Sequence, residues 1–177
     1  MIIQIRIDSR LIHGQVVLGW TRELDTPRIL VVDDDAATTD KTTNATLHMG
    51  VQAAGGGQKL FIKTRADAIQ LINDPRMDNY RVFLITRYTE DAWEIVRQCP
   101  GRVLAVNCAN YGFHKEEIPE DEQVQLDRYI CSKSDIEYMN HLVNTPNLDV
   151  FHQITPNYKK EMIIDLLKAK NLYKPEN

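Results

Sequence analysis

Asp8, Arg10 and His13 lie within six residues of one another near the start of the chain. From residue 6 to residue 16 the stretch reads Arg-Ile-Asp-Ser-Arg-Leu-Ile-His-Gly-Gln-Val. A histidine ring with one unprotonated nitrogen can accept a phosphoryl group, and its usual pKa of about 6.5 leaves most rings neutral at neutral pH. Arg10 offers a planar fork of donors to phosphoryl oxygens, and Asp8 can hold the second ring nitrogen as a donor. These residue types together favour a histidine that carries a phosphoryl group.

The elements around these residues predict where they lie. Apolar residues alternate over 2–7, which predicts a strand, and residues 15–24 predict a helix. The three residues therefore fall in a strand-to-helix turn, which in an open α/β sheet lies at the carboxyl edge where ligands bind. The backbone N–H groups that open the helix, at Gly14 and Gln15, suit a phosphate, and Gly14 lets the backbone approach it closely.

Each of these assignments has a structural alternative. His13 taken alone is typical of a hydrogen-bonded loop histidine. Asp8 can instead pair with Arg10 or cap the turn. Thr86 and Arg87 end the fourth predicted strand and are further candidates for phosphate binding, although Arg87 can equally be a solvated loop arginine.

The rest of the chain alternates predicted strands and helices. Strands are expected at 28–33, 59–63, 81–86, 102–107, 129–131 and 149–153, and helices at 39–54, 64–72, 90–98, 134–143 and 158–169. This alternation predicts a single α/β doubly wound domain over residues 1–177, with a mostly parallel sheet of about six or seven strands and helices on both faces. Right-handed crossovers then bring one set of polar residues to the carboxyl edge. The set is Asp8, Arg10, His13, Asp33, Asp34, Arg87 and Asn107. Helix capping by Asp33 and Asp34, and a loop tie by Asn107, are the alternatives for three of them.

Composition excludes several classes of function. The chain has 177 residues and a formal net charge of −4, which argues against a nucleic-acid partner. Three cysteines without a CxxC motif favour reduced, buried thiols in a cytoplasmic protein. No apolar run approaches the roughly 20 residues of a membrane span, and no signal peptide is evident, so no direct membrane insertion is expected.

Motifs for metals and cofactors are absent from the sequence. No histidine pair has a metal spacing such as HxxxH, so no metal site is expected. Gly55-Gly56-Gly57 follows a predicted helix and precedes a strand, the reverse of a phosphate loop, and no GxGxxG follows the first strand. No cofactor is therefore expected.

Residues 6–17 resemble the opening of the IIB components of the mannose/fructose/sorbose family of the bacterial sugar phosphotransferase system (PTS), which reads approximately R-I-D-D-R-L-I-H-G-Q-V. Further similarities are Ile29–Asp34 followed by Ala36, the stretch Glu90–Ala92, Val106-Asn107, and Gln153 with Pro156. The resemblance implies a cytoplasmic α/β domain and a protein-N(pi)-phosphohistidine–sugar phosphotransferase. His13 would take a phosphoryl group from a phosphorylated IIA component and pass it to a sugar entering through the membrane components IIC and IID. Arg10 would bind the phosphoryl group, and Asp8 matches the first aspartate of the motif.

The chain departs from this family pattern at three places. Ser9 replaces the usual second aspartate and removes a negative charge beside the site. Residues 107–110, Asn-Cys-Ala-Asn, replace an asparagine followed by paired glycines, so this segment is expected to differ in shape. Residues 153–156 carry one residue more than the usual Q-V-P. These departures affect the preference for substrate and partner and leave His13 and Arg10 in place.

Two other functions compete with a phosphohistidine carrier. One is a non-catalytic regulatory relative that binds a phosphorylated partner or a small anion. The other is an unrelated nucleotide-binding enzyme of doubly wound fold, which the missing glycine motifs disfavour.

Overall fold

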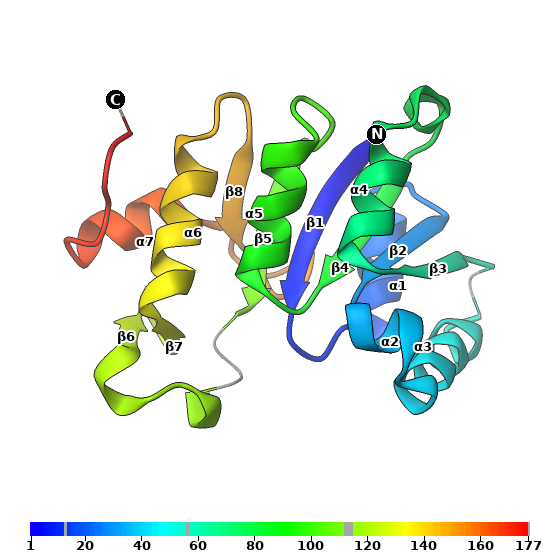
Figure 1. Ribbon diagram of the computed structural model, residues 1–177, viewed down its shortest axis with the longest axis horizontal. Coiled ribbons are helices and arrows are strands. Elements are labelled where there is room, and N and C mark those ends of the chain that lie inside the picture. Colours follow the sequence, from blue (N-terminus) through cyan, green and yellow to red (C-terminus); the bar gives the residue numbers. More distant parts are fainter. Residues whose placement is uncertain (13, 56, 112–114, 177) are drawn as a thin grey trace.

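A seven-stranded sheet with the order β3-β2-β4-β1-β5-β8-β9 forms the centre of the computed structural model, which describes residues 1–12, 14–55, 57–111 and 115–176 (Figure 1). Its strands are β1 (Ile2–Asp8), β2 (Arg28–Val32), β3 (Lys59–Lys63), β4 (Val82–Thr86), β5 (Ala105–Asn110), β8 (Asp149–His152) and β9 (Glu161–Met162). All neighbouring strands are parallel except β8 and β9, which are antiparallel. The predicted α/β class and the mostly parallel sheet are therefore confirmed.

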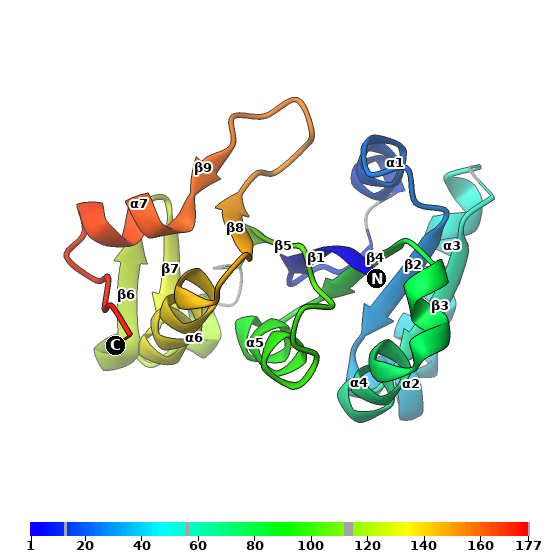
Figure 2. The same ribbon diagram turned by 90° about the horizontal axis from the view of Figure 1, so that it is seen from above.

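Helices cover both faces of the sheet, as Figure 2 shows. The helices are α1 (Gly14–Glu23), α2 (Asp34–Thr38), α3 (Lys41–Ala53), α4 (Arg65–Asn73), α5 (Thr89–Gln98), α6 (Lys133–Asn144) and α7 (Ile163–Ala169). Short 3-10 turns cover Pro75–Asn79, Lys115–Glu117 and Glu120–Glu122. One face packs α1 and α3 against side chains such as Ile29, Val31 and Phe83. The other packs α4, α5 and α6 against Leu30 and Leu84 and their neighbours. None of the helices in the described ranges is long and apolar enough to cross a membrane.

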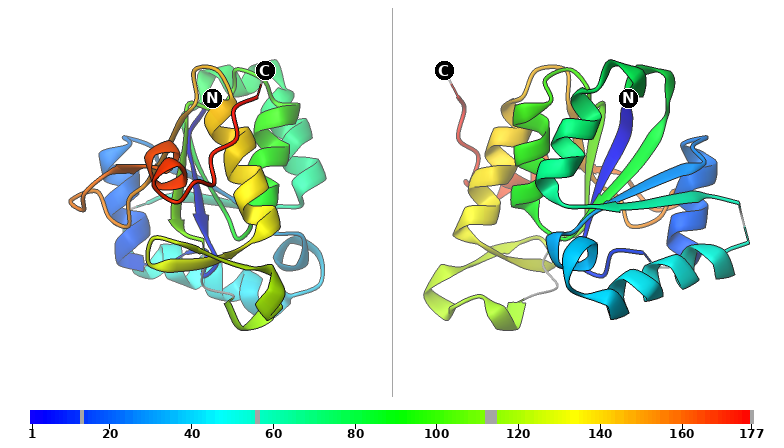
Figure 3. Two further views of the ribbon diagram at one scale, coloured as in Figure 1. Left: turned by 90° about the vertical axis from the view of Figure 1, so that its left-hand side faces the viewer. Right: turned by 45° about the vertical axis from the view of Figure 1, so that its right-hand side comes forward.

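The position of β1 places the first turn at a branch in the fold. β1 lies between β4 and β5, and its following helix α1 packs on the opposite face from α5 and α6. After β1 the chain therefore crosses to one face of the sheet, whereas after β4 and β5 it crosses to the opposite face. In doubly wound sheets such a divergence opens a crevice at the carboxyl ends of the strands. The hairpin of β6 (Gln123–Leu126) and β7 (Tyr129–Ser132) lies at this same edge (Figures 1 and 3).

Capping side chains define where several helices begin. Asp33, Asp40 and Thr64 each accept a hydrogen bond from the backbone N–H three residues later, which fixes the starts of α2, α3 and α4. Helix capping, one of the two roles predicted for Asp33, is thus confirmed. The helix expected from residue 134 instead begins after Ser132, because Ser132 and Asp135 form a reciprocal capping box.

Two predicted boundaries were wrong, and one helix was not predicted. The strand expected at 102–107 runs over 105–110, and the helix expected from 158 begins at 163, because residues 161–162 pair with β8 as β9. The short helix α2 was not anticipated. The cysteines were predicted correctly, because Cys99, Cys108 and Cys131 are buried and free.

Candidate phosphoryl-transfer site

The turn between β1 and α1 spans residues 9–13, with Asp8 ending the strand and Gly14 beginning the helix. The Leu11 N–H donates to the Asp8 carbonyl at 2.8 Å, and Leu11 adopts a positive φ of 57° while its side chain is buried. A leucine in this left-handed conformation is uncommon and is held here by its packing. His13 lies outside the described residues. Gly14 and Gln15 are described only as the backbone that opens α1, where both were predicted to lie.

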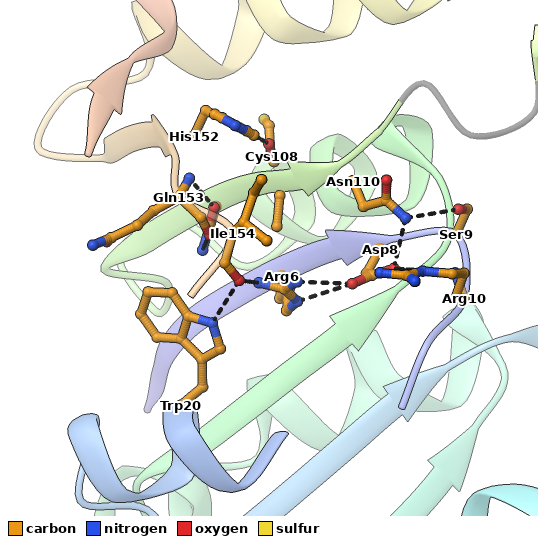
Figure 4. Close-up of polar contacts among 12 residues, drawn as sticks. Arg6, Asp8, Ser9, Arg10, Trp20, Cys108, Asn110, His152, Gln153 and Ile154 are labelled. Carbon is orange, nitrogen blue, oxygen red and sulfur yellow. Dashed lines mark hydrogen bonds and ion pairs between the residues drawn. The ribbon is translucent and has the colours of Figure 1, made fainter. Parts of the chain in front are cut away.

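A buried ion pair fixes the end of β1. The Arg6 guanidinium donates to Asp8 Oδ2 from Nη2 at 2.8 Å and from Nε at 3.2 Å (Figure 4). Both side chains are essentially inaccessible to solvent, at 1% exposure for Arg6 and 0% for Asp8. Arg6 Nη1 donates to the Ile154 carbonyl at 3.0 Å, and the Trp20 indole N–H donates to the same oxygen at 3.3 Å. Burial lowers the pKa of Arg6, and the nearby Asp8 carboxylate opposes that change.

The second oxygen of Asp8 organises the turn itself. Asp8 Oδ1 accepts hydrogen bonds from the Arg10 backbone N–H at 3.2 Å and from the Asn110 side-chain amide at 3.1 Å. It also lies 3.7 Å from Arg10 Nε. Both structural alternatives for Asp8, capping the turn and pairing with Arg10, are therefore realised. The Arg10 side chain remains 43% exposed, so its guanidinium is anchored at one end and accessible to an incoming anion.

Asn110 also reaches Ser9, one of the departures from the family pattern. Its amide lies 3.5 Å from Ser9 Oγ, and Ser9 is 3% exposed. An uncharged side chain suits this buried position beside the Asp8 carboxylate, because a second buried carboxylate would repel the first. Residues 107–110, expected as a loop of altered shape, belong to strand β5.

Arg87 ties the end of β4 to its neighbours on both sides. Its Nε donates to Asp33 Oδ2, and its Nη1 donates to the Ser9 carbonyl at 2.7 Å. Asp33 Oδ1 meanwhile accepts from the Ala36 N–H and caps α2. Arg87 is 25% exposed and doubly bonded, so it is not a solvated loop arginine. Its predicted role in phosphate binding stays a prediction, and its observed contacts hold the first turn against β4.

Thr86 is directed away from the turn into the start of α5. It is fully buried, and its hydroxyl donates to Asp91 Oδ2 at 2.9 Å. Burial raises the pKa of Asp91, and this hydrogen bond opposes that change. The predicted contact of Thr86 with phosphate is untested, while its bond to Asp91 gives it a structural role.

Two residues expected at the carboxyl edge have other partners. The Asn107 amide donates to the Gln153 carbonyl at 2.9 Å and its oxygen accepts from the Gln153 N–H, so Asn107 ties down the loop after β8. Asp34 accepts the Arg65 N–H at 2.7 Å.

The sequence did not predict Arg6 and Asn110 as partners of Asp8, although both side chains donate hydrogen bonds to its carboxylate. The signal for Arg6 was its spacing, since residues 6 and 8 of one strand project to the same face.

A buried histidine at the end of β8 packs against β5, the strand that contains Asn110. His152 is fully buried, its Nδ1 lies 2.7 Å from the Cys108 carbonyl, and the Tyr111 and Tyr129 rings both contact its ring edge-on. Burial lowers the pKa of His152. A neutral ring that donates from Nδ1 fits this contact with the Cys108 carbonyl. The side chain packed against β5 is then uncharged.

The carboxyl edge of the sheet presents cationic side chains and backbone N–H donors, and the hollows lined by Arg87 there are small. The two hollows that Arg87 lines hold about 250 Å³ each, too small to enclose most ligands and compatible with a partner protein reaching the turn. No cluster of three or more His, Cys, Asp or Glu residues suited to a metal ion occurs within the described ranges. The exposed Arg10 guanidinium and the N–H groups that open α1 can stabilise the oxygens of a transferring phosphoryl group.

Comparisons with known proteins identify the family. The model of the PTS system sorbose subfamily IIB component matches residues 2–177. A probable phosphotransferase enzyme IIB component of Streptococcus pyogenes is 37% identical over 167 residues, covering 94% of this chain and 99% of that protein. The mannose-specific EIIAB component of Escherichia coli K12 is 32% identical over 123 residues, covering 69% of this chain and 36% of that longer protein.

The fold has a close counterpart among solved structures. The crystal structure of the IIBSor domain of the sorbose permease from Klebsiella pneumoniae matches with a TM-score of 0.80 at 21% identity, covering 96% of this chain and 97% of that one. At this identity the match establishes the fold, and the sequence comparisons establish the family. The chain therefore belongs to the sorbose subfamily of PTS IIB components, the phosphoryl carriers of sugar uptake.

Proposed function

We propose that His13 is the residue that carries the phosphoryl group. The observation that supports this most directly is the construction of the turn in which His13 lies. The turn connects the central strand to α1, contains the exposed Arg10 guanidinium, and rests on a fully buried Asp8 carboxylate. Such a frame presents a cation and a helix N-terminus at the carboxyl edge of the sheet, and it needs little rearrangement when negative charge arrives.

The proposed transfer has two displacement steps at phosphorus. A nitrogen of the His13 ring attacks the phosphoryl group of phosphorylated IIA, a new P–N bond forms, and the P–N bond to the IIA histidine breaks. A sugar hydroxyl then attacks the phosphorus on His13, the second P–N bond breaks, and the hydroxyl proton leaves to a base. Arg10 would stabilise the equatorial oxygens in both steps. This is the chemistry of a protein-N(pi)-phosphohistidine–sugar phosphotransferase.

Family membership implies interaction with IIA and with the membrane components IIC and IID. We propose direct contact with each in turn at the exposed rim of the β1–α1 turn, in the cytoplasm, with membrane association only through IIC and IID. The relatives are named for mannose and sorbose, so we propose a hexose as the sugar. The whole chain, residues 1–177, is proposed to be one IIB domain. The alternative of a non-catalytic regulatory relative gains no support from these comparisons.

Phosphate labelling tests this proposal. Incubation with phosphorylated IIA should place an acid-labile, alkali-stable phosphate on the wild-type chain, and His13→Ala should remain unlabelled. His48→Ala is the matched control, because His48 is exposed on α3 and should leave labelling unchanged. Adding membranes that contain IIC and IID should then yield sugar phosphate. An unlabelled wild type, or label that persists in His13→Ala, would overturn the proposal, and label without onward transfer would favour the regulatory alternative.

A further inference from the structure

The outer edge of β3 is open. β3 ends the sheet, with β2 as its neighbour in the described part of the chain (Figure 1). The Lys59 N–H donates to the Pro27 carbonyl, and the Lys63 carbonyl accepts from the Asp33 N–H, so the backbone groups of 59, 61 and 63 face β2. Because successive residues of a strand face opposite edges, the N–H and C=O groups of Leu60 and Ile62 face outward. An added strand could pair with them.

An apolar hollow lies beside this edge. It holds about 520 Å³ between β3, α4 and the segment after α4, and its lining includes Leu30, Phe61, Leu71 and Tyr80. Phe61 and Tyr80 are 45% and 42% exposed, which is unusual for large side chains that flank a core. The hollow therefore offers apolar contact area directly next to outward-facing backbone groups.

The rim of the hollow is basic in a protein of net charge −4. Lys59 and Lys63 lie on the same side of β3 as Phe61, one on each side of it along the strand, and all three line the hollow. Arg28 lies over the Tyr80 ring, with its Cζ 4.5 Å from the ring centroid. Among the ion pairs of the described residues, none involves Arg28, Lys59 or Lys63. The nearby carboxylate Asp74 is already paired with Arg76.

We propose that the β3 edge binds an extended acidic segment of a partner protein as an additional strand. Main-chain pairing with Leu60 and Ile62 would supply affinity, and side chains at alternate positions would supply specificity. The pattern that fits is acidic–x–apolar–x–acidic. The apolar side chain enters the hollow beside Phe61, and the two carboxylates meet Lys59 and Lys63. The site is remote from the Arg10 turn and does not depend on the phosphoryl-transfer proposal.

Charge also argues against a second copy of the chain as the occupant. Two antiparallel β3 strands centred on Phe61 would place Lys59 of each copy directly opposite Lys63 of the other. Like charges in opposed pairs are destabilising, and lysines on edge strands commonly prevent such self-association. The same two lysines favour an acidic strand.

Peptide binding to the intact protein tests this inference. The probe is the capped heptapeptide Thr-Glu-Thr-Leu-Thr-Glu-Thr, titrated into isotopically labelled protein and followed by backbone amide NMR. The same peptide with both Glu replaced by Lys is the ligand control. The protein variants are Lys59→Glu/Lys63→Glu and the matched pair Lys170→Glu/Lys174→Glu, which changes the net charge equally at two exposed positions elsewhere. Thermal unfolding of both variants checks that they fold.

The expected result is saturable binding of the glutamate peptide, with shifts concentrated at residues 59–63. Binding should weaken about tenfold in Lys59→Glu/Lys63→Glu, because two partly exposed ion pairs are lost, and should weaken in added salt. Lys170→Glu/Lys174→Glu should bind as the wild type does. Equal binding of the lysine peptide, shifts away from β3, or unchanged binding by Lys59→Glu/Lys63→Glu would overturn the proposal. Binding to phosphatidylglycerol vesicles with none to the peptide would also overturn it, as would a dimer that Lys59→Glu/Lys63→Glu dissociates.

Discussion

Asp8→Asn should destabilise the protein strongly although the two side chains have nearly the same shape. The substitution removes the carboxylate that receives two hydrogen bonds from Arg6, and Arg6 is 1% exposed. Removing one partner of a buried ion pair typically costs about 3–5 kcal/mol, because the remaining charge stays buried. For a chain of this length each kcal/mol lowers the melting temperature by roughly 2–4 °C, so a fall of about 6–20 °C is expected.

A double-mutant cycle isolates the charge pair. Urea unfolding followed by circular dichroism gives the free energy for the wild type, Asp8→Asn, Arg6→Met and the double variant. The double variant should be more stable than the sum of the single losses predicts, with a coupling of about 1–3 kcal/mol. The double variant should carry phosphate more slowly than the wild type, because it lacks the Asp8 carboxylate that accepts the Arg10 N–H and organises the turn. Additivity within about 0.5 kcal/mol, or a loss below about 1 kcal/mol in Asp8→Asn, would refute the reasoning.

Three further predictions concern buried or paired groups. Burial lowers the pKa of His152, so the unfolded state binds a proton at this residue more readily than the folded state does. The free energy of unfolding should therefore fall as the pH drops below about 6.5. Urea titrations at several pH values should show a weaker fall in His152→Gln. Burial raises the pKa of the Cys108 and Cys131 thiols, so a thiol reagent such as DTNB should react with them only after unfolding, and rapid reaction of the native protein would contradict this. Arg87→Ala should lower stability by about 1–2 kcal/mol and slow labelling by IIA, and Arg87→Lys should not restore either, because lysine lacks the fork that spans Asp33 and the first turn.

The sequence was sufficient to predict the turn that contains His13 because the relevant signals are local. An alternating apolar run, a break, and a helical pattern fix the β1–α1 boundary to within a residue or two. The edge at which Asp8, Arg10 and Arg87 meet also follows from the sequence, since right-handed crossovers bring all strand-to-helix turns of a parallel sheet together.

Asn110 could not be predicted beside Asp8 because its place depends on strand register. The pairing of β1 with β5 shifts between Ile7 and Asp8, so that Ile7 is opposite Cys108 and Asp8 is opposite Asn110. The irregularity adds one residue to β5, which ends at Asn110, three residues beyond its expected end. Local propensity favours Val103 and Leu104 as strand residues and contains no information about the partner strand.

The burial of Arg6 was also beyond local reasoning. Within an apolar strand an arginine is expected at the surface, and it is stable inside only when its donors find acceptors. Two of those donors reach Asp8, but the third reaches the carbonyl of Ile154. The acceptor at Ile154 is a main-chain carbonyl, which every residue type has, so the residue types at 6 and 154 do not predict this bond.

The bond between Arg6 and Ile154 has a consequence for the order of folding. It joins residues 148 positions apart, and closing a loop of that length costs about 4 kcal/mol of chain entropy. Because β1 occupies the centre of the sheet, it cannot complete its pairing until β5 is made, and Arg6 Nη1 lacks its acceptor until the segment after β8 is made. The turn between β1 and α1, our proposed site of phosphoryl transfer, should therefore become rigid late in biosynthesis, and an incomplete chain would then not compete for phosphorylated IIA.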